Sequence, residues 1–380
     1  MKADMNMNLY LIYEPVDADA FWITDIVDGI VRESMKKALN LIVINDGNLY
    51  SEHSGSQSDT ERPLVLVVGC SLIWIDRTLR ELSAAGAEPI LVSVYEHRFS
   101  SVCSSVAFNT IDAMRSLVCA IASSGRRSIA FFALHRDTIG DFAKLKGYAA
   151  GMHACQLPFQ AADIFERGSI ADCAGQLCQQ ISHYDAVVCS NDLLATYLTR
   201  HLQSCGIRVP EDICVTGFGN WSVVDSFTPK LTRMYTDLTE LGCQAVRLHQ
   251  YLQFNPQIGH CSSVLECTLQ TGETAPLRSS VTACPDFALS SGIQAPAYST
   301  DPDIMELLRA EHLVRSLDEI DRKILSSLIA GQTYSATADA IPISESTVKY
   351  RIGKILKFCG FADRQELLDF ITKYHLFTRS

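Results

Sequence analysis

The sequence predicts an α/β protein with two parallel sheets, followed by a separate all-helical domain. Short apolar runs alternate with amphipathic stretches from residue 8 to about residue 275. Such near-continuous apolar strands, separated by helices, are typical of parallel sheets that are covered on both faces. This alternation is too long for one compact sheet and favours two. After residue 316 the pattern changes to four short helical stretches.

The first 135 residues supply the first part of this alternation. Phe21 opens a stretch in which Ile23, Ile26 and Ile30 recur at helical spacing. Gly86 and Gly125 end later helical stretches. The predicted strands are 9–13, 41–44, 63–68, 89–94 and 128–134, and the predicted helices are 21–39, 75–85 and 111–123.

The second half repeats the scheme up to residue 252. The predicted helices are 140–153, 170–182, 193–204 and 238–252, with strands at 186–189 and 213–216. Ligands of open α/β sheets bind at the carboxyl ends of the strands, where the loops converge. The loops expected there are 14–22, 69–76, 95–101, 135–141, 190–192 and 217–225.

Composition limits the class of protein. The chain has 380 residues, of which 47% are hydrophobic and 20% charged, with a formal net charge of -11. This length predicts two or three domains at about 100–200 residues each. We find no secretory signal and no apolar run of the ~18–20 residues that span a membrane. We therefore expect a soluble cytoplasmic protein without a membrane partner.

The fourteen cysteines do not indicate a disulfide framework. Most lie in apolar surroundings, as small hydrophobic residues do, and we expect thiols in a reducing compartment. No CxxC pair occurs, and Cys173 and Cys178 lack a second ligand pair at zinc-like spacing. We therefore predict no metal site and no cofactor.

The periodic pattern stops after residue 275, which divides the chain. Residues 276–302 are rich in Ser, Ala, Thr and Pro and read as a linker, and 303–315 resume helical spacing. We accordingly predict an effector-binding domain over residues 1–275, a linker and connecting helix over 276–315, and a third domain over 316–380.

The third domain contains helical stretches at 317–330, 334–341, 345–358 and 364–374. Gly331 suits the end of the first, and Pro342 must end the second. Ser344 is placed to cap the third, whose exposed face carries several lysines. Two helices joined by a tight turn, the second one capped and basic, favour a helix-turn-helix that reads a DNA major groove.

Three strings resemble the effector-binding core of lac-repressor-type regulators: VVCSND at 187–192, GIRVPEDI at 206–213 and VTGFGN at 215–220. That core shares the two-lobed fold of periplasmic binding proteins. The resemblance implies a hinged cleft that closes on a small effector. Carried over by position, the effector-binding residues are Asp112, Lys144, Asn191, Gly219 and Asn220.

Two departures bear on the effector. Lys144 stands where the family usually has arginine, and Gly219 where it usually has aspartate, so the effector is a sugar or another small polar or anionic metabolite. Trp22 and Trp221 lie on predicted cleft loops, where ring stacking on a ligand competes with packing. Lys144 as a solvated helix residue and Asn191 as a turn former are open alternatives.

The strings ISESTVK at 343–349 and KILKFCG at 354–360 resemble the four-helix DNA-binding domain of LuxR/GerE-type regulators. By that resemblance, Lys349, Tyr350 and Lys354 meet bases or adjacent phosphates, while Thr347 and Lys357 meet phosphates. Ser346 lies on the same face. A solvated charged helix face is the alternative.

Together these features predict a one-component bacterial transcription regulator that binds a small effector and, as a homodimer, double-stranded DNA. A phosphorylated response regulator is disfavoured because about 275 residues precede the linker and no acidic phosphoacceptor cluster stands out. An α/β enzyme is disfavoured because no P-loop, GxGxxG, GxSxG or HExxH occurs. A ligand-binding protein without DNA function would lack residues 317–374.

Overall fold

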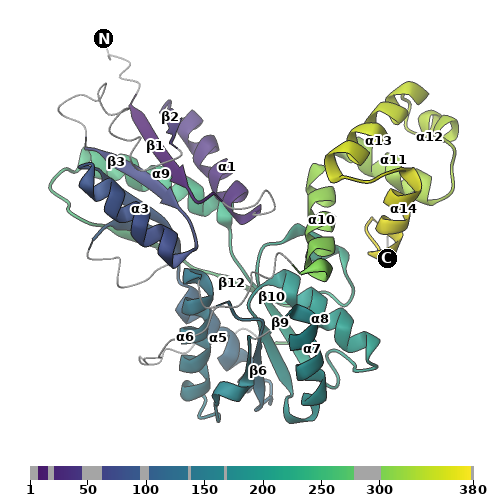
Figure 1. Cartoon of the computed structure of the whole chain (residues 1–380), viewed down its shortest axis with the longest axis horizontal. Coiled ribbons are helices and arrows are strands. Elements are labelled where there is room, and N and C mark those ends of the chain that lie inside the picture. The colour runs from purple at the N-terminus through teal and green to yellow at the C-terminus, as the bar shows by residue number, and fades with distance from the viewer. Residues whose placement is uncertain are drawn as a thin grey trace. The chain divides into compact units, whose positions relative to one another are not determined.

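The computed structural model describes residues 7–15, 21–44, 62–94, 102–135, 138–166, 169–277 and 301–377 (Figure 1). These residues form two compact units. The first unit falls within residues 1–166, 234–270 and 277–295, and the second within 167–233, 271–276 and 296–380. Within the described residues, no helix is both long and apolar enough to span a membrane.

The first sheet lies wholly in the first unit and is parallel throughout. Its strand order is β11-β5-β4-β3-β1-β2. In the register, Leu66 lies opposite Leu11 on one side and Ile90 on the other. The strands are β1 (Asn8–Tyr13), β2 (Asn40–Val43), β3 (Leu64–Val68), β4 (Glu88–Val94), β5 (Ser104–Phe108) and β11 (Ser262–Leu265).

Helices cover both faces of this sheet with separate apolar cores. Helices α1 (Phe21–Lys36) and α9 (Leu238–Phe254) pack on one face, and α3 (Leu72–Ala84) on the other. Helices α1 and α9 touch at glycines: a Cβ on Gly29 would lie 2.0 Å from the Thr239 carbonyl oxygen, and one on Gly242 2.0 Å from that of Ile26. Backbone approach this close requires glycine.

The second sheet has the strand order β12-β10-β9-β8-β6-β7. The pairs β6–β7 and β8–β9 are parallel. Its strands are β6 (Ile129–Phe132), β7 (Ile164–Phe165), β8 (Ala186–Cys189), β9 (Cys214–Gly219), β10 (Thr232–Tyr235) and β12 (Thr268–Gln270). The accompanying helices are α5 (Thr110–Ser123), α6 (Ile139–Ala154), α7 (Ile170–Gln179) and α8 (Asp192–Ser204), with the 3₁₀ turns η3 (Ala161–Asp163), η4 (Ile181–His183) and η5 (Ser222–Ser226). The predicted α/β fold with two sheets is confirmed.

The sequence prediction missed five strands: β5, β7, β10, β11 and β12. Two of these strands lack a clear apolar pattern because they contain polar residues. Strand β5 begins with Ser104 and Ser105, and β10 contains Thr232 and Arg233. All of these four side chains are nevertheless buried. Strands β7 and β12 have only two and three residues, too few for a periodic signal.

Five helices lie within residues 301–377, in the second unit, and we call the last four of them the tail. They are α10 (Pro302–Ser316), α11 (Glu319–Ile329), α12 (Tyr334–Ala340), α13 (Glu345–Cys359) and α14 (Arg364–Lys373), all labelled in Figure 1. The last four agree within two residues with the helical stretches predicted from the sequence. Of the predicted linker 276–302, residues 278–300 lie outside the described residues.

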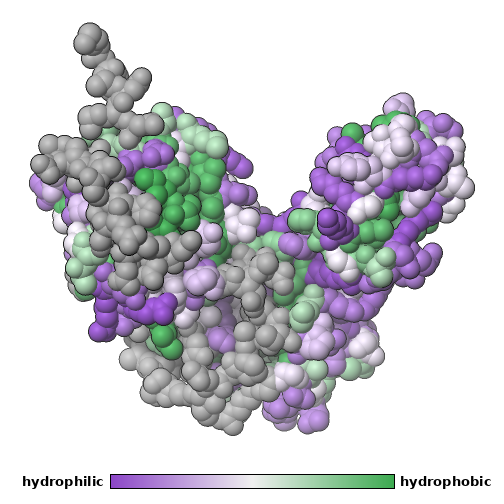
Figure 2. Space-filling model, turned by 45° about the horizontal axis from the view of Figure 1, so that its top comes forward, coloured by the Kyte–Doolittle hydropathy of each residue, from purple (hydrophilic) through white to green (hydrophobic). Residues whose placement is uncertain are grey.

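Caps define the boundaries of these helices. Ser344 accepts the backbone N–H of Thr347 at the start of α13, and Gly360 ends that helix with a φ of 68°. Gly331 adopts a φ of 81° after α11. The left-handed region favours glycine at such helix ends. The surface of the tail seen in Figure 2 is mostly hydrophilic, with smaller hydrophobic areas.

Candidate functional site

A buried ionic cluster lies at the end of β9 in the second unit. The Asp192 side chain is completely buried at the start of α8, and its Oδ2 lies 3.3 Å from Nη1 of Arg233. Arg233 also donates through Nη2 to Asp225 at 3.1 Å and through Nη1 to the Trp221 carbonyl oxygen at 3.3 Å. This pairing matters because burying an uncompensated charge is costly.

Glycines make room for the Asp192 carboxylate. A Cβ on Gly217 would lie 2.6 Å from its Oδ1, and one on Gly219 3.4 Å from its Oδ2. Gly219 has a φ of 140°, which side chains rarely adopt. The absence of a side chain at position 219, noted above as a departure from the resembled family, therefore coincides with a close contact to Asp192.

Three residues that the sequence singled out lie next to this cluster along the chain: Asn191 directly precedes Asp192, and Asn220 and Trp221 follow β9. Asn191 caps α8, accepting the Leu194 backbone N–H at 3.0 Å through Oδ1. Its amide oxygen thus serves the helix, which supports the alternative of a local structural role. Asn220 and Trp221 are half-buried at the start of η5.

In the first unit, Lys144 lies on α6 beside an acidic partner. Its Nζ is 2.9 Å from Oδ1 of Asp141, and the two side chains are only 14% and 10% exposed. The second oxygen of Asp141 accepts the His135 backbone N–H at 3.0 Å. Lys144 is therefore a half-buried cation in an ion pair rather than a freely solvated one.

Asp112 and Trp22 have different surroundings. Asp112 lies in the first turn of α5, with Oδ1 3.0 Å from Nη2 of Arg115, and its side chain is 53% exposed. Trp22, on α1, packs against the apolar core of the first sheet. For Trp22 the structure thus displays the packing alternative.

Sequence reasoning overlooked a buried carboxylate in the first unit. Glu14 follows β1 and accepts the backbone N–H groups of Cys70 and Ser71 at 2.8 and 3.0 Å. This places an acidic group at the carboxyl end of β1 and β3, where loops are expected to bind ligands. The Glu14-Pro15 dipeptide after an apolar strand was the available signal.

In the tail, α13 exposes the side chains that the sequence singled out. Ser346, Lys349, Tyr350, Lys354 and Lys357 are all exposed, and Thr347 is half-buried. The opposite face is buried and consists of Val348, Ile352, Ile355 and Cys359. We call the exposed set, together with Thr347, the basic face of α13.

The cations of α13 differ in their partners. Lys349 pairs with Glu345 at 2.6 Å on the same helix. Arg351 pairs with Asp318 and Asp321 of α11, both at 2.8 Å, and this guanidinium lowers the pKa of Asp318 to about 2. Within the described chain, Lys354 and Lys357 have no acidic partner.

Helix α10 contacts both the tail and the second-sheet region of the same unit. The buried Glu311 accepts the backbone N–H groups of Ser222, at 3.0 Å, and Val223, in η5. Arg309 donates to the carbonyl oxygens of Cys359 and Gly360, at 3.1 and 2.6 Å, at the end of α13. One helix thus joins η5, next to the ionic cluster, to the end of α13.

Comparison with known proteins shows what this chain is similar to. Residues 118–275 match the family described as a periplasmic binding protein-like domain. The HTH-type transcriptional repressor PurR of Vibrio atlanticus (strain LGP32) is 26% identical over 233 residues, covering 59% of this chain and 69% of that protein. The HTH-type transcriptional regulator GntR of Escherichia coli (strain K12) is 27% identical over 171 residues, covering 44% of this chain and 50% of that protein.

Solved structures match a larger share of the chain than the family model does. A transcriptional regulator CelR-cellobiose complex superposes with a TM-score of 0.58 at 20% identity, covering 70% of this chain and 84% of that chain. The transcription regulator CcpA of Lactococcus lactis gives 0.59 at 18% identity, covering 71% and 99%. The two-sheet part of this chain therefore has the same fold as these structures, and residues 118–275 within it match the periplasmic binding protein-like family.

The shared two-sheet fold accounts for part of what the sequence predicted. The relatives carry the names of transcription regulators, not of enzymes. The family match ends at residue 275, before the tail begins. Asp192 and Arg233 were not predicted as site residues; the available signals were the charged residue after Asn191 and the arginine within the apolar setting of β10.

Proposed function

We propose that this protein is a one-component transcription regulator. Residues 1–275 sense a small molecule, residues 276–315 connect, and residues 316–380 bind DNA as a LuxR/GerE-type helix-turn-helix. The regulator names of the relatives support the sensor half of this proposal. The observation that carries the DNA half is the basic face of α13, exposed on a capped helix that follows α12 by a short turn.

Helix α13 is the recognition helix in this proposal. An α-helix fits the major groove, and the first turns of a recognition helix contact base edges. Lys349, Tyr350 and Lys354 contact bases or adjacent phosphates, and Ser346, Thr347 and Lys357 contact the backbone. The tyrosine is 73% exposed and therefore accessible to DNA.

Binding requires two copies of the chain. A single α13 offers few cations, one of them paired with Glu345, and the chain carries a net charge of -11. Phosphate contacts supply most of the affinity, so one recognition helix gives weak binding. A homodimer presents two recognition helices to two half-sites and doubles the contacts.

The effector is a small polar metabolite, a sugar or another polar or anionic compound. The residues assigned to its contacts are Trp22, Asp112, Lys144, Asn191 and 219–221. The Asp192–Arg233 pair helps to position residues 219–221, since Arg233 donates a hydrogen bond to the Trp221 carbonyl oxygen. The protein acts in the cytoplasm, where both the metabolite and the DNA are present.

Selection of duplexes from a random DNA library by the full chain tests the DNA claim. The affinity of a selected duplex is then measured by fluorescence anisotropy at several salt concentrations. K354A is expected to weaken binding and to reduce the salt slope by about one. K323A is the matched control, because Lys323 is an exposed lysine on α11, paired with Glu319. Failure to select any duplex, or equal effects of the two variants, contradicts the proposal.

Thermal-shift screening of the full chain tests the sensor claim. The panel consists of sugars, sugar acids, nucleosides and amino-acid-like compounds. A ligand that binds only the folded state raises the unfolding temperature. A stabilising compound whose effect is lost in N191A or W221A supports the assigned residues. If a compound stabilises the protein equally well in every variant at these positions, the assignment of these residues to the effector site is wrong.

A further inference from the structure

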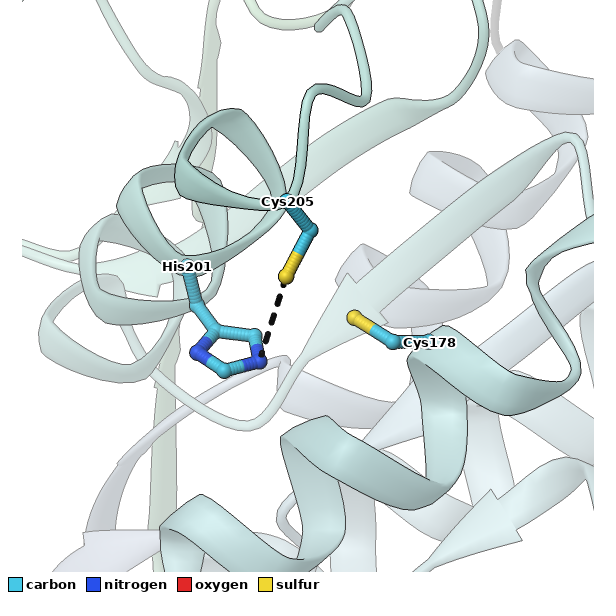
Figure 3. A group of neighbouring side chains, drawn as sticks. All are labelled: Cys178, His201 and Cys205. Carbon is cyan, nitrogen blue, oxygen red and sulfur yellow. Dashed lines mark hydrogen bonds between the residues drawn. The ribbon is translucent and has the colours of Figure 1, made fainter.

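Three side chains of the types that bind soft metal ions converge in the second unit, outside the sites described above. Cys178 lies in the last turn of α7, His201 in the last turn of α8, and Cys205 directly after α8 (Figure 3). Their candidate ligand atoms all lie within 4.8 Å of one another. Figure 3 shows the Cys178 sulfur pointing toward the gap between the other two side chains.

The spacing suits one tetrahedral ion. Zinc bonds of ~2.3 Å to sulfur and ~2.0 Å to nitrogen place tetrahedral ligand atoms about 3.5–3.8 Å apart. The Cys205 sulfur is 3.9 Å from Nε2 of His201. We propose that Cys178, His201 and Cys205 form a binding site for a divalent ion of the zinc class, with water in the fourth position.

The fold presets two of the three ligands. His201 and Cys205 are four residues apart and therefore project from the same face of α8. The third ligand comes from the neighbouring helix and is not required by the core. Cys173, on the same helix α7, has 2% exposure in the apolar core, whereas Cys178 is half-buried and faces α8.

The ligand types define the class of ion. Two thiolates and an imidazole select zinc and similar ions over Mg²⁺ and Ca²⁺, which require oxygen ligands. Both thiols lose their protons to solvent when the ion binds, so the site becomes a dithiolate–imidazole complex without net charge. The exposure of Cys205 gives the ion and its water a path from solvent.

The site lies beside the connecting helix. The His201 ring stacks on Tyr197, one turn earlier on α8, with ring centroids 6.0 Å apart and an interplanar angle of 14°. The Tyr197 hydroxyl donates to Asp303, in the first turn of α10, at 3.4 Å. An ion that holds the His201 imidazole in place therefore also restrains the Tyr197 ring, which contacts α10. Ion binding is thus expected to stabilise the contact between α8 and α10.

Titration of the reduced full chain with Co²⁺ and then Zn²⁺ tests the site. Co²⁺ is expected to bind at one equivalent, with thiolate-to-cobalt charge-transfer absorption and the intense visible bands of tetrahedral cobalt, and Zn²⁺ is expected to displace it. C178S, C205S and H201Q should each weaken Zn²⁺ binding by roughly tenfold or more, since even outer-shell substitutions at metal sites cost that much.

A second thiol pair provides the matched control. The sulfurs of Cys119 and Cys155 lie 3.3 Å apart in the first unit. C119S should bind Co²⁺ as the unchanged chain does. Circular dichroism of metal-free C205S, which alters an exposed side chain, checks that the variant folds. Cobalt binding without thiolate absorption, or full affinity in folded C178S and C205S, overturns the proposal. None of these measurements involves DNA, so the site stands or falls separately from the regulator function.

Discussion

At the scale of single residues, the second unit depends on one buried ion pair. Asp192 is fully buried, and Arg233 is its ionic partner. Asp225 binds the same guanidinium, but its side chain is 68% exposed. Breaking a buried pair by removing one partner leaves a buried charge, whereas an exposed carboxylate is solvated by water. Arg233 therefore contributes more to folding through Asp192 than through Asp225.

The substitution R233M is expected to destabilise the protein by about 3–5 kcal/mol, because the Asp192 carboxylate loses its cation. D225N removes the solvated partner of the same arginine and is expected to cost less than about 1 kcal/mol. Differential scanning calorimetry of both full-length variants at neutral pH measures the difference. Equal destabilisation by the two substitutions would mean that Arg233 acts mainly by packing.

A buried histidine predicts how stability depends on pH. His249 on α9 has no measurable exposure, and neither ring nitrogen has a hydrogen-bond partner within the described residues. Burial lowers its pKa from 6.5 to about 4. The unfolded chain therefore binds a proton between these values that the folded chain does not. The stability that this difference supplies is complete above pH 6.5 and is lost as the pH falls toward 4.

H249L is expected to flatten this part of the pH dependence. The unchanged protein should lose about 1.4 kcal/mol per pH unit from this group between pH 6.5 and 4, in addition to the losses from other groups. H249L lacks this titrating group, so its loss of stability over the same pH range should be smaller by that amount. It should also be more stable at neutral pH, because no polar nitrogen is then buried unpaired. Urea unfolding at pH 5 and pH 7 measures both effects; parallel pH profiles for the two proteins would contradict the assignment.

At the scale of elements, the glycine within α13 and the glycine that ends it have opposite roles. Gly360 ends α13 with a φ of 68°, whereas Gly353 lies in the exposed interior of the same helix. A Cβ at either position would meet no atom within 4 Å. Only backbone conformation therefore distinguishes them, since glycine in a helix interior is unfavourable and glycine in the left-handed region is favoured.

G353A is expected to stabilise the protein by about 0.5–1 kcal/mol, and G360A to destabilise it by about 1 kcal/mol. Thermal unfolding monitored by circular dichroism compares the two variants. The sign is the decisive result. If both substitutions change stability in the same direction, the end of α13 is not set by the left-handed conformation of Gly360.

The elements also show what sequence could predict. The tail helices were predictable because each is delimited by local signals, such as Ser344 at one end of α13 and Gly360 at the other. Strand β10 was not, because its burial comes from distant residues: the hydroxyl of Thr232 donates to the carbonyl oxygen of Ala275 at 2.6 Å. The ionic cluster and the Cys178–His201–Cys205 group were missed for the same reason, since tertiary contacts assemble them.

At the scale of the molecule, α10 links the second sheet's surroundings to the tail, beside a direct contact between Phe227, after η5, and Tyr374, after α14, whose ring centroids are 6.2 Å apart. Glu311 holds it to η5 and pairs with Arg315 at 2.7 Å on the same helix. Arg309 holds α13, and its guanidinium lies 3.8 Å from the Phe361 ring centroid. The two anchors are two residues apart and point to different neighbours. A change at η5 can therefore reach α13 by way of α10 only if both anchors hold.

We accordingly expect E311A to separate the unfolding of the tail from that of the rest of the chain. The substitution removes a buried acceptor and leaves the Ser222 and Val223 N–H groups without it, at a cost of about 1–3 kcal/mol for each unsatisfied group. Calorimetry should then show the tail unfolding in its own, lower transition, while the salt slope of DNA binding is unchanged because the basic face of α13 is intact. E306A is the matched control: Glu306 lies on the same helix, pairs with Lys373 of α14, and has a side chain 44% exposed. An E311A profile identical to that of E306A would show that Glu311 does not hold α10 to η5, and coupling between sensor and tail would then require another route.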